Sequence, residues 1–212
     1  MKIIFMGPSG AGKGTISAFI TRDYGIPHVS SGDIFRDHLR RGTELGREVE
    51  GFMKAGHWIP DEITMKVIFD RLGQPDVADG FLLDGVPRTM AQANLLNEQI
   101  NVDLVIELDV SDEIVIDRLG GRFMCRGCGT IHNRRFDSVD VCKECGGELF
   151  QRNDDRDDAI RNRLASYRKY ASQIADFYRD MGKLFVVHVK PSDLPIDNYN
   201  TIKEKLEEFY GD

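Results

Sequence analysis

The sequence predicts an α/β fold, a doubly wound parallel sheet of five strands flanked by helices, in a chain of 212 residues. Apolar runs alternate with helical patterns along most of the chain, which is the order of βαβ units. The apolar runs are continuous, as is typical of strands that are covered on both faces. A glycine-rich loop separates the first strand from the first helix, as in folds that bind ligands at the carboxyl ends of parallel strands.

Five strands and five helices account for the alternation. The first strand covers residues 2–6, and a helix runs from residue 13 until Gly25 ends it at its C-terminal cap. The other strands are expected at 27–30, 81–85, 104–108 and 184–189. The other helices are expected near 61–72, 88–99, 111–119 and 154–180.

Two stretches interrupt the alternation and are expected to form inserts. Residues 31–59 are helical in character but are broken by Gly42, Gly46, Gly51 and Gly56, which indicates a small helical insert. Residues 120–153 hold all four cysteines and have little apolar content, so they could not build a hydrophobic core of their own.

The glycine-rich loop "GPSGAGKGT", residues 7–15, has the composition of a phosphate-binding loop. Its backbone N–H groups can surround phosphate oxygens, and the dipole of the following helix favours negative charge. Lys13 would reach the transferred phosphates. The commonest form of the motif has Ser or Thr directly after the lysine, whereas here Gly14 intervenes and the hydroxyl comes at Thr15. The order of strand, loop and helix still favours a phosphate site over a chance run of glycines.

A second candidate site is "GFLLDGVPRT", residues 80–89. Asp84 ends an apolar strand, so its carboxylate would lie at the ligand-binding edge of a parallel sheet and could hold magnesium through water. Arg88 follows at the start of the next helix and could clamp a phosphate. Taken alone, the segment is equally consistent with an ordinary Asp-Gly turn and an exposed arginine.

The cysteines form two C-x₂-C pairs, Cys125 with Cys128 and Cys142 with Cys145, separated by 13 residues. Four thiolates at this spacing are typical of a structural zinc site, since no coordination position stays open for catalysis. Iron is the main alternative for four sulfur ligands, and disulfides are not expected in a cytoplasmic chain. We expect His132 to be a plain loop residue, because the cysteines already complete the shell.

Charge and composition limit the partners. The net charge of −7 argues against general nucleic-acid binding. No apolar run approaches the roughly 18 residues that span a bilayer, and the N-terminus has no cleavage-site pattern, so we expect a cytoplasmic protein without a membrane partner. The chain has 18 arginines and 10 lysines, and the guanidinium fork suits small phosphorylated ligands.

Together these motifs resemble the adenylate kinase family, in the long form whose lid carries a zinc knuckle. The resemblance covers most of the chain in order and ends with "QRNDDRDDAIRNRL" (151–164). Between the phosphate loop and that segment it is carried by "HVSSGDIFR" (28–36), "IPDE" (59–62), "GFLLDGVPRT", "DRLGGR" (117–122) and the cysteine pairs. In this family Gly-Lys-Gly-Thr is the usual form of the loop. The resemblance implies a P-loop NTPase-type core of residues 1–29, 60–120 and 158–212, a helical AMP-binding insert at 30–59 and a zinc-binding lid at 121–157.

The resemblance also implies an activity, reversible phosphoryl transfer from ATP to AMP that gives two ADP, with magnesium and structural zinc as cofactors. ATP, AMP and ADP would be the partners, and we expect a monomer because hinged lids need free surfaces. The residues implied for ATP are Gly10, Ala11, Gly12, Lys13, Gly14, Thr15, Arg118 and Arg122. Those implied for AMP are Ser31, Arg36, Gly85, Arg88, Gln92, Arg152 and Arg163. The catalytic charges would be Lys13, Arg88, Arg122, Arg152 and Arg163, with Asp84 near magnesium and the acidic pair Asp154 and Asp155 linked to lid closure.

The chain departs from the family pattern at three places. Ser9 stands where the family's loop has proline, and Val86 where it has phenylalanine. The segment between the cysteine pairs is shorter, lacks a proline pair and carries Arg126, Arg134 and Arg135, which we expect to be solvated charges. Contacts from this lid to the ATP base therefore stay open.

Two alternatives remain open at this point. One is another nucleoside monophosphate kinase with a different donor or acceptor base, since phosphate-binding residues do not select the base. The other is a zinc-ribbon binding module whose cysteines meet RNA or protein. The acidic charge balance and the lack of aromatic residues patterned around the cysteines weigh against the second.

Overall fold

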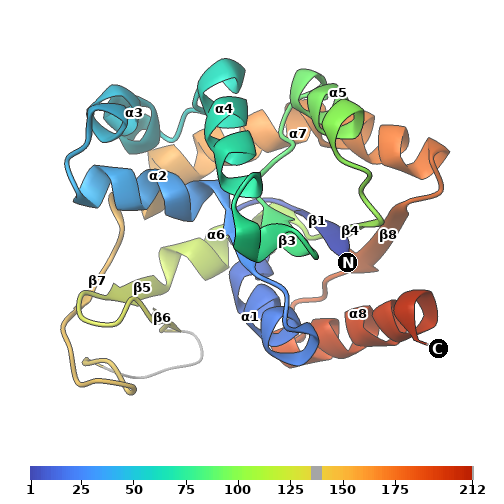
Figure 1. Ribbon diagram of the computed structural model, residues 1–212. Coiled ribbons are helices and arrows are strands. Elements are labelled where there is room, and N and C mark those ends of the chain that lie inside the picture. The colour runs from blue at the N-terminus through green and yellow to red at the C-terminus, as the bar shows by residue number, and fades with distance from the viewer. Residues whose placement is uncertain (135–139, 212) are drawn as a thin grey trace.

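The computed structural model describes residues 1–134 and 140–211 and has a five-stranded parallel sheet at its centre (Figure 1). The strand order is β2-β3-β1-β4-β8, and every neighbouring pair is parallel. This confirms the predicted fold class, and all five predicted strands are present. The strands are β1 Lys2–Met6, β2 His28–Ser30, β3 Phe81–Asp84, β4 Leu104–Asp109 and β8 Leu184–His188.

Helices cover both faces of the sheet, with α1 and α8 on one side and α4, α5 and α7 on the other (Figure 1). The α-helices are α1 Lys13–Tyr24, α2 Ser31–Arg40, α3 Glu44–Ala55, α4 Asp61–Leu72, α5 Met90–Gln99, α6 Asp112–Gly120, α7 Asp157–Asp180 and α8 Pro195–Tyr210. Short 3-10 helices cover Pro75–Val77 and Asn153–Asp155. Within the described residues, none of these helices combines the length and the apolar character that a membrane crossing requires.

Alternate residues of β1 point into two separate apolar cores, which explains the continuous apolar runs of the strands. Ile3 and Phe5 pack into one core, and Ile4 and Met6 into the other. The first core is closed by α1, α6, α8 and the N-terminal half of α7, and the second by α4, α5 and the C-terminal half of α7. The sequence analysis did not predict α8, although its buried residues Tyr199, Ile202 and Leu206 recur at helical spacing.

The phosphate loop is held against the rest of the core by close packing. Gly10 has a φ of +88°, and a Cβ at that position would lie 2.7 Å from Cγ of Leu119 on α6. A side chain at this position would therefore be strained and would also displace the Leu119 side chain. The loop ends where α1 begins, after Gly12, and Gly25 ends this helix in the left-handed conformation as predicted.

Residues 31–59 form two packed helices, α2 and α3. The Ser30 side chain caps α2 by accepting a hydrogen bond from the Asp33 N–H, and Thr43 caps α3 in the same way. Of the four glycines expected to break this stretch, only two do so. Gly42 and Gly56 lie beyond helix ends with positive φ, whereas Gly46 and Gly51 lie inside α3. Gly46 is needed where α3 approaches the backbone of His38 closely.

The cysteine-bearing segment projects from the sheet as a separate small unit (Figure 1). It contains an antiparallel sheet of order β6-β5-β7, formed by β5 Arg122–Cys125, β6 Ile131–Asn133 and β7 Leu149–Phe150. Among its described residues, none belongs to either of the two apolar cores. Apolar burial therefore contributes little to holding this unit together.

Candidate active site and metal centre

A cleft of about 750 Å³ opens at the carboxyl ends of the central strands. The register of β1 with β3 pairs Phe5 with Asp84, which brings the end of β3 beside the phosphate loop. The cleft is lined by residues from this loop, from the end of β3 and from the cysteine-bearing unit. They include Ser9, Gly10, Gly12, Lys13, Gly14, Thr15, Asp84, Gly85, Val86, Arg88, Arg36, Arg118, Arg122, Arg152 and Arg163. Ligands of open α/β sheets bind at this edge.

Lys13 lies at the mouth of the loop, and 11% of its side-chain surface is exposed. Its Nζ donates hydrogen bonds to the carbonyl oxygens of Gly7, at 2.8 Å, and Pro8, at 3.0 Å. Burial lowers the pKa of Lys13, and the nearby charge of Asp84 opposes that shift. Thr15 lies in the first turn of α1, as predicted. A Cβ at Gly14 would meet no protein atom within 4 Å, so the residue after Lys13 faces open space.

Asp84 lies opposite Lys13, with 3.6 Å between its Oδ1 and Nζ. His28 Nε2 is 3.6 Å from Oδ2, a contact that the sequence analysis missed. Burial alone would raise the pKa of Asp84, but Lys13, His28 and Arg88 outweigh it and hold the pKa below its ordinary value. The carboxylate is thus ionised, and its Oδ1 accepts no hydrogen bond within the protein. Such an oxygen suits a hydrated divalent cation.

Arg88 is fixed by its neighbours on both sides. Its Nε donates to the Gly85 carbonyl at 2.7 Å, and its backbone N–H donates to Oε1 of Gln92 at 2.7 Å. Asp61, at the start of α4, accepts from Gln92 Nε2 at 2.7 Å and from the Thr89 hydroxyl at 2.6 Å. Asp61 was missed as a functional residue, and its only sequence signal was its place in "IPDE".

A second cavity of about 70 Å³ adjoins the cleft. Ser31 and Gln92 line this smaller cavity and not the main cleft, whereas Arg152, which is also implied for AMP, lines only the main cleft. Arg36, Gly85, Arg88 and Arg163 line both cavities. Gly85 has a φ of +86°, and a side chain there would clash with the Ser31 hydroxyl. The loop after β3 can therefore approach the start of α2 only with glycine at this position.

Three of the predicted arginines rest on two adjacent carboxylates. Arg122 Nε donates to Oδ2 of Asp155 at 2.7 Å, and the Asp155 side chain is fully buried. Arg152 Nε donates to Oδ1 of Asp154 at 2.9 Å. Arg163 Nη1 lies 3.3 Å from Asp154 Oδ2 and 3.6 Å from Asp155 Oδ1. The two aspartates therefore join the cysteine-bearing unit, through Arg122, to α7, through Arg163.

Burial and these ion pairs shift the pKa values of Asp154 and Arg163. Burial alone would raise the pKa of Asp154, but Arg152, Arg163 and Arg122 lower it to about 2. Burial lowers the pKa of Arg163 to about 10 although Asp154 opposes the change. Asp154 and Arg163 are thus both charged at neutral pH, and the negative charge of Asp154 partly balances the positive charge of the arginines around it.

Ala11, which is implied for ATP, is placed differently from the rest of the loop. The Ala11 side chain is buried and does not line the cleft. Its carbonyl oxygen instead accepts a hydrogen bond of 3.0 Å from Nη1 of Arg118. Arg118 also donates to the Asp193 carbonyl at 3.3 Å, so it joins the phosphate loop to the segment before α8.

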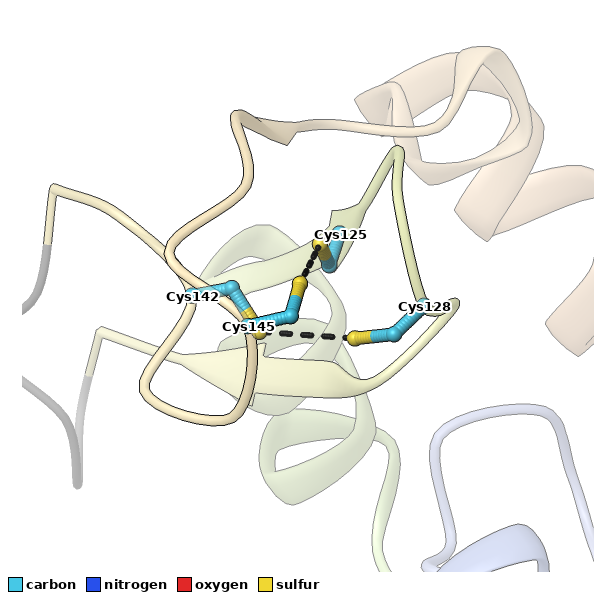
Figure 2. Close-up of side chains that lie close together, drawn as sticks. All are labelled: Cys125, Cys128, Cys142 and Cys145. Carbon is cyan, nitrogen blue, oxygen red and sulfur yellow. Dashed lines mark hydrogen bonds between the residues drawn. The ribbon is translucent and has the colours of Figure 1, made fainter.

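The four cysteine sulfurs form one cluster, in which all Sγ atoms lie within 4.8 Å of one another (Figure 2). Cys125 Sγ is 3.4 Å from Cys145 Sγ, and Cys128 Sγ is 3.5 Å from Cys142 Sγ. None of the four is in a disulfide. In the part of the chain that the structure describes, this is the only group of three or more His, Cys, Asp or Glu side chains close enough to hold a metal ion. Its four sulfur donors fit a closed tetrahedral zinc site.

The surroundings of the cysteines differ from expectation at His132. This residue was predicted to lie in a loop, but it is buried on β6, and its Nε2 is 3.3 Å from Cys142 Sγ. Two of the extra arginines are packed on aromatic rings: Arg126 lies 4.5 Å from the centroid of Phe150, and Arg134 lies 4.2 Å from that of Phe123. They are thus only partly the solvated charges we expected. Arg135 lies outside the described residues.

Comparison with known proteins agrees with this geometry. Residues 5–183 match the family model described as adenylate kinase. The chain is 42% identical to the adenylate kinase of Symbiobacterium thermophilum over 215 residues, which cover 97% of this chain and 98% of that protein. It is 44% identical to the adenylate kinase of Methanothrix thermoacetophila, with 86% of this chain and 88% of that protein covered. It is 41% identical to that of Syntrophomonas wolfei, with 98% and 99% covered. The chain therefore belongs to the adenylate kinase family of enzymes.

Proposed function

We propose that this chain catalyses reversible, magnesium-dependent transfer of the γ-phosphoryl group of ATP to AMP, giving two ADP. The observation that supports it most directly is the convergence of Lys13 and six arginines on one cleft at the carboxyl edge of the sheet. Phosphoryl transfer depends on positioning and on positive groups around the charge of the transferred group. In the cell the reaction would balance and salvage adenine nucleotides.

The residues divide into a donor side and an acceptor side in this proposal. On the donor side, Gly10 to Thr15 would hold the ATP phosphates, with Lys13 at the transferred group and Arg118 and Arg122 beside it. On the acceptor side, AMP would be held by Ser31, Arg36, Gly85, Arg88, Gln92, Arg152 and Arg163. The smaller cavity that adjoins the cleft supports an acceptor site distinct from the donor loop.

Chemistry by this route needs no covalent intermediate and no general base. The attacking atom would be an oxygen of the AMP phosphate, which is already ionised at neutral pH. Arg88, Arg122, Arg152 and Arg163 would stabilise the charge on the transferred phosphoryl group, and the Lys13 ammonium would contact the same group. Exclusion of water by closure of the two inserts would prevent hydrolysis of ATP.

Magnesium and zinc would have separate roles. Bound magnesium supplies charge neutralisation on the ATP phosphates. Asp84 would hold the water shell of the ion. This is supported by its lowered pKa and by its Oδ1, which accepts no hydrogen bond among the described residues. The site of Cys125, Cys128, Cys142 and Cys145 would hold structural zinc, because a unit without an apolar core needs another source of stability.

The same proposal divides the chain into three parts. The core would consist of residues 1–29, 60–120 and 158–212, the AMP-binding insert of 30–59 and the zinc-binding lid of 121–157. Asp154 and Asp155 would link lid closure to the core through their arginines. We propose further that the protein acts as a cytoplasmic monomer without nucleic-acid or membrane partners.

Phosphorus NMR of the purified protein tests the reaction directly. The protein is incubated with Mg-ATP and, in separate samples, AMP, GMP, CMP or UMP. We expect ADP to form with AMP alone, and ATP and AMP to form from ADP alone. Turnover with another monophosphate would contradict the assigned acceptor base, and no turnover with any of them would contradict the activity.

A further inference from the structure

Trp58, the one tryptophan of the chain, contacts the guanidinium of Arg88. The distance from Arg88 Cζ to the centroid of the Trp58 ring is 5.8 Å, which is within the range of a cation–π contact. The Trp58 ring also packs against Tyr170 of α7 in a tilted arrangement, with 5.6 Å between centroids and 33° between planes. The ammonium of Lys169 lies 4.8 Å from the centroid of Tyr170. Trp58 thus connects Arg88 to helix α7 through aromatic contacts.

Arg88 differs in its partners from four of the other arginines of the cleft. Those four are each paired with a carboxylate: Arg36 with Asp33, Arg122 with Asp155, Arg152 with Asp154, and Arg163 with both Asp154 and Asp155. Among the described residues, Arg88 has no carboxylate within ion-pair distance. Its side chain is held by the Gly85 carbonyl and by the face of Trp58.

This difference matters for phosphate binding. A carboxylate occupies the N–H groups of a guanidinium, so an arginine paired in this way must exchange its partner when phosphate arrives. An aromatic face attracts the positive charge and leaves those N–H groups unoccupied. Among the described residues, Nε is the only guanidinium nitrogen of Arg88 that donates a hydrogen bond, to the Gly85 carbonyl. The terminal nitrogens of the guanidinium are therefore available to a ligand.

We propose that Trp58 is a positioning residue that holds Arg88 ready for the phosphate of the acceptor nucleotide. The inference rests on the function proposed above and adds a residue to its acceptor side. Trp58 lines the smaller cavity together with Arg88, Ser31 and Gln92, and it also lines the main cleft. Loss of Trp58 should consequently weaken the binding of the acceptor AMP. Binding of the donor ATP at the phosphate loop should stay unaffected.

Steady-state kinetics of three full-length variants test this. Trp58→Leu removes the aromatic face and keeps apolar bulk, whereas Trp58→Phe keeps a face. Phe52→Leu is the matched control, because Phe52 is an exposed aromatic residue of the same insert that lines neither cavity. We expect Trp58→Leu to raise the KM for AMP about 5- to 10-fold, from the size of a partly buried cation–π contact. The KM for ATP should stay within about twofold of that of the unmodified chain. In Trp58→Phe the KM for AMP should return most of the way to the unmodified value.

Calorimetric titration with AMP shows whether Trp58 acts through Arg88. The affinity is measured for the unmodified chain, Trp58→Leu, Arg88→Ala and the double variant. If Trp58 positions Arg88, Trp58→Leu lowers the affinity for AMP about 5- to 10-fold in the unmodified chain. In Arg88→Ala the same change lowers the affinity by less than about twofold. Equal losses in both backgrounds would overturn the proposal.

The outcomes separate this inference from the proposed function. If the unmodified chain does not convert ATP and AMP to ADP, the proposed function fails first. If it does, an unchanged KM for AMP in Trp58→Leu refutes the inference alone. Equal increases in both KM values with a lowered melting temperature would show a general structural role and would also refute it.

Discussion

Lys13 Nζ and Asp84 Oδ1 lie 3.6 Å apart: Asp84 ends β3, and Lys13 opens α1 after the phosphate loop that follows the neighbouring strand β1. The register of β1 with β3 fixes this relationship, because Asp84 stands level with Phe5 just before the phosphate loop. Each charge offsets part of the burial cost of the other. The pair marks the point where a transferred phosphoryl group and a hydrated cation could meet.

Asp84→Asn should raise the magnesium requirement. The change keeps the shape of the side chain but removes the negative charge that would hold the hydrated cation. We expect the free Mg²⁺ concentration for half-maximal activity to rise about tenfold, equivalent to ~1.4 kcal/mol. Activity measured against free Mg²⁺ at fixed nucleotide checks this, with the exposed Asp79→Asn as control. An unchanged magnesium dependence would remove Asp84 from the cation site.

Arg88→Ala should lower kcat by about 10²- to 10³-fold, because one donor to the charge of the transferred group is lost. The melting temperature should change little, since the side chain holds no carboxylate among the described residues. Rapid measurement of ADP formation gives kcat. Arg40→Ala, an exposed arginine of α2, should behave as the unmodified chain. A rate close to that of the unmodified chain would exclude Arg88 from the chemistry.

Asp61→Ala should weaken AMP binding, although Asp61 itself would not contact the nucleotide. Asp61 accepts hydrogen bonds from both Gln92 and Thr89, so its loss leaves two part-buried donors without a partner. We expect a loss of ~1–3 kcal/mol in the free energy of unfolding and a several-fold higher KM for AMP. Urea denaturation and initial rates provide the two values. The neighbouring Glu62→Ala, at an exposed site, serves as control, and equal behaviour of the two variants would refute the prediction.

Replacing both Cys142 and Cys145 with serine should release the bound metal and lower the melting temperature. Two hard oxygen donors bind zinc more weakly than two thiolates, and the unit around them has no apolar core to compensate. Measurable activity is expected to remain at low temperature, because the phosphate loop lies elsewhere. Elemental analysis and thermal melts test this, and a chelator added to the unmodified chain should reproduce the shift. Unchanged metal content would show that the ligand set is wrong.

Asp154 should contribute to acid sensitivity. Its pKa is lowered to about 2 in the folded chain, below its ordinary value of 3.8. The resulting stability, ~2 kcal/mol, is complete above about pH 4 and is lost as the pH falls through about 2. Asp154→Asn should therefore be less stable at pH 7, and its stability should vary less between pH 5 and pH 2. Urea denaturation along this pH range compares it with Asp158→Asn, an exposed carboxylate of α7. Parallel pH profiles for the three proteins would contradict the assignment.

The sheet could be predicted from the sequence because its strands are buried on both faces and so are apolar without interruption. The phosphate loop and the cysteine pairs were evident because their chemistry requires fixed spacing. Helix α8 was missed because its second half is dominated by lysine and glutamate, and its buried residues are few. Its packing on α1 comes only from the folded chain.

The contacts that support the site residues could not be predicted, because they join residues that are distant in the sequence. Asp61 and Gln92 are 31 residues apart, and His28 and Asp84 meet only because β2 and β3 are neighbours. Trp58 reaches Arg88 through the turn between α3 and α4. No local pattern encodes such pairs, whereas the residues that they support follow recognisable motifs.

The absence of apolar core residues from the described part of 121–157 has a consequence for heat capacity. Apolar surface exposed on unfolding is the main source of the positive heat-capacity change, so the two cores have a stability that curves with temperature. A unit held by metal–thiolate bonds would expose little such surface and would contribute little to this curvature. The cysteine-bearing unit and the sheet would then respond to cooling and heating along differently shaped stability curves.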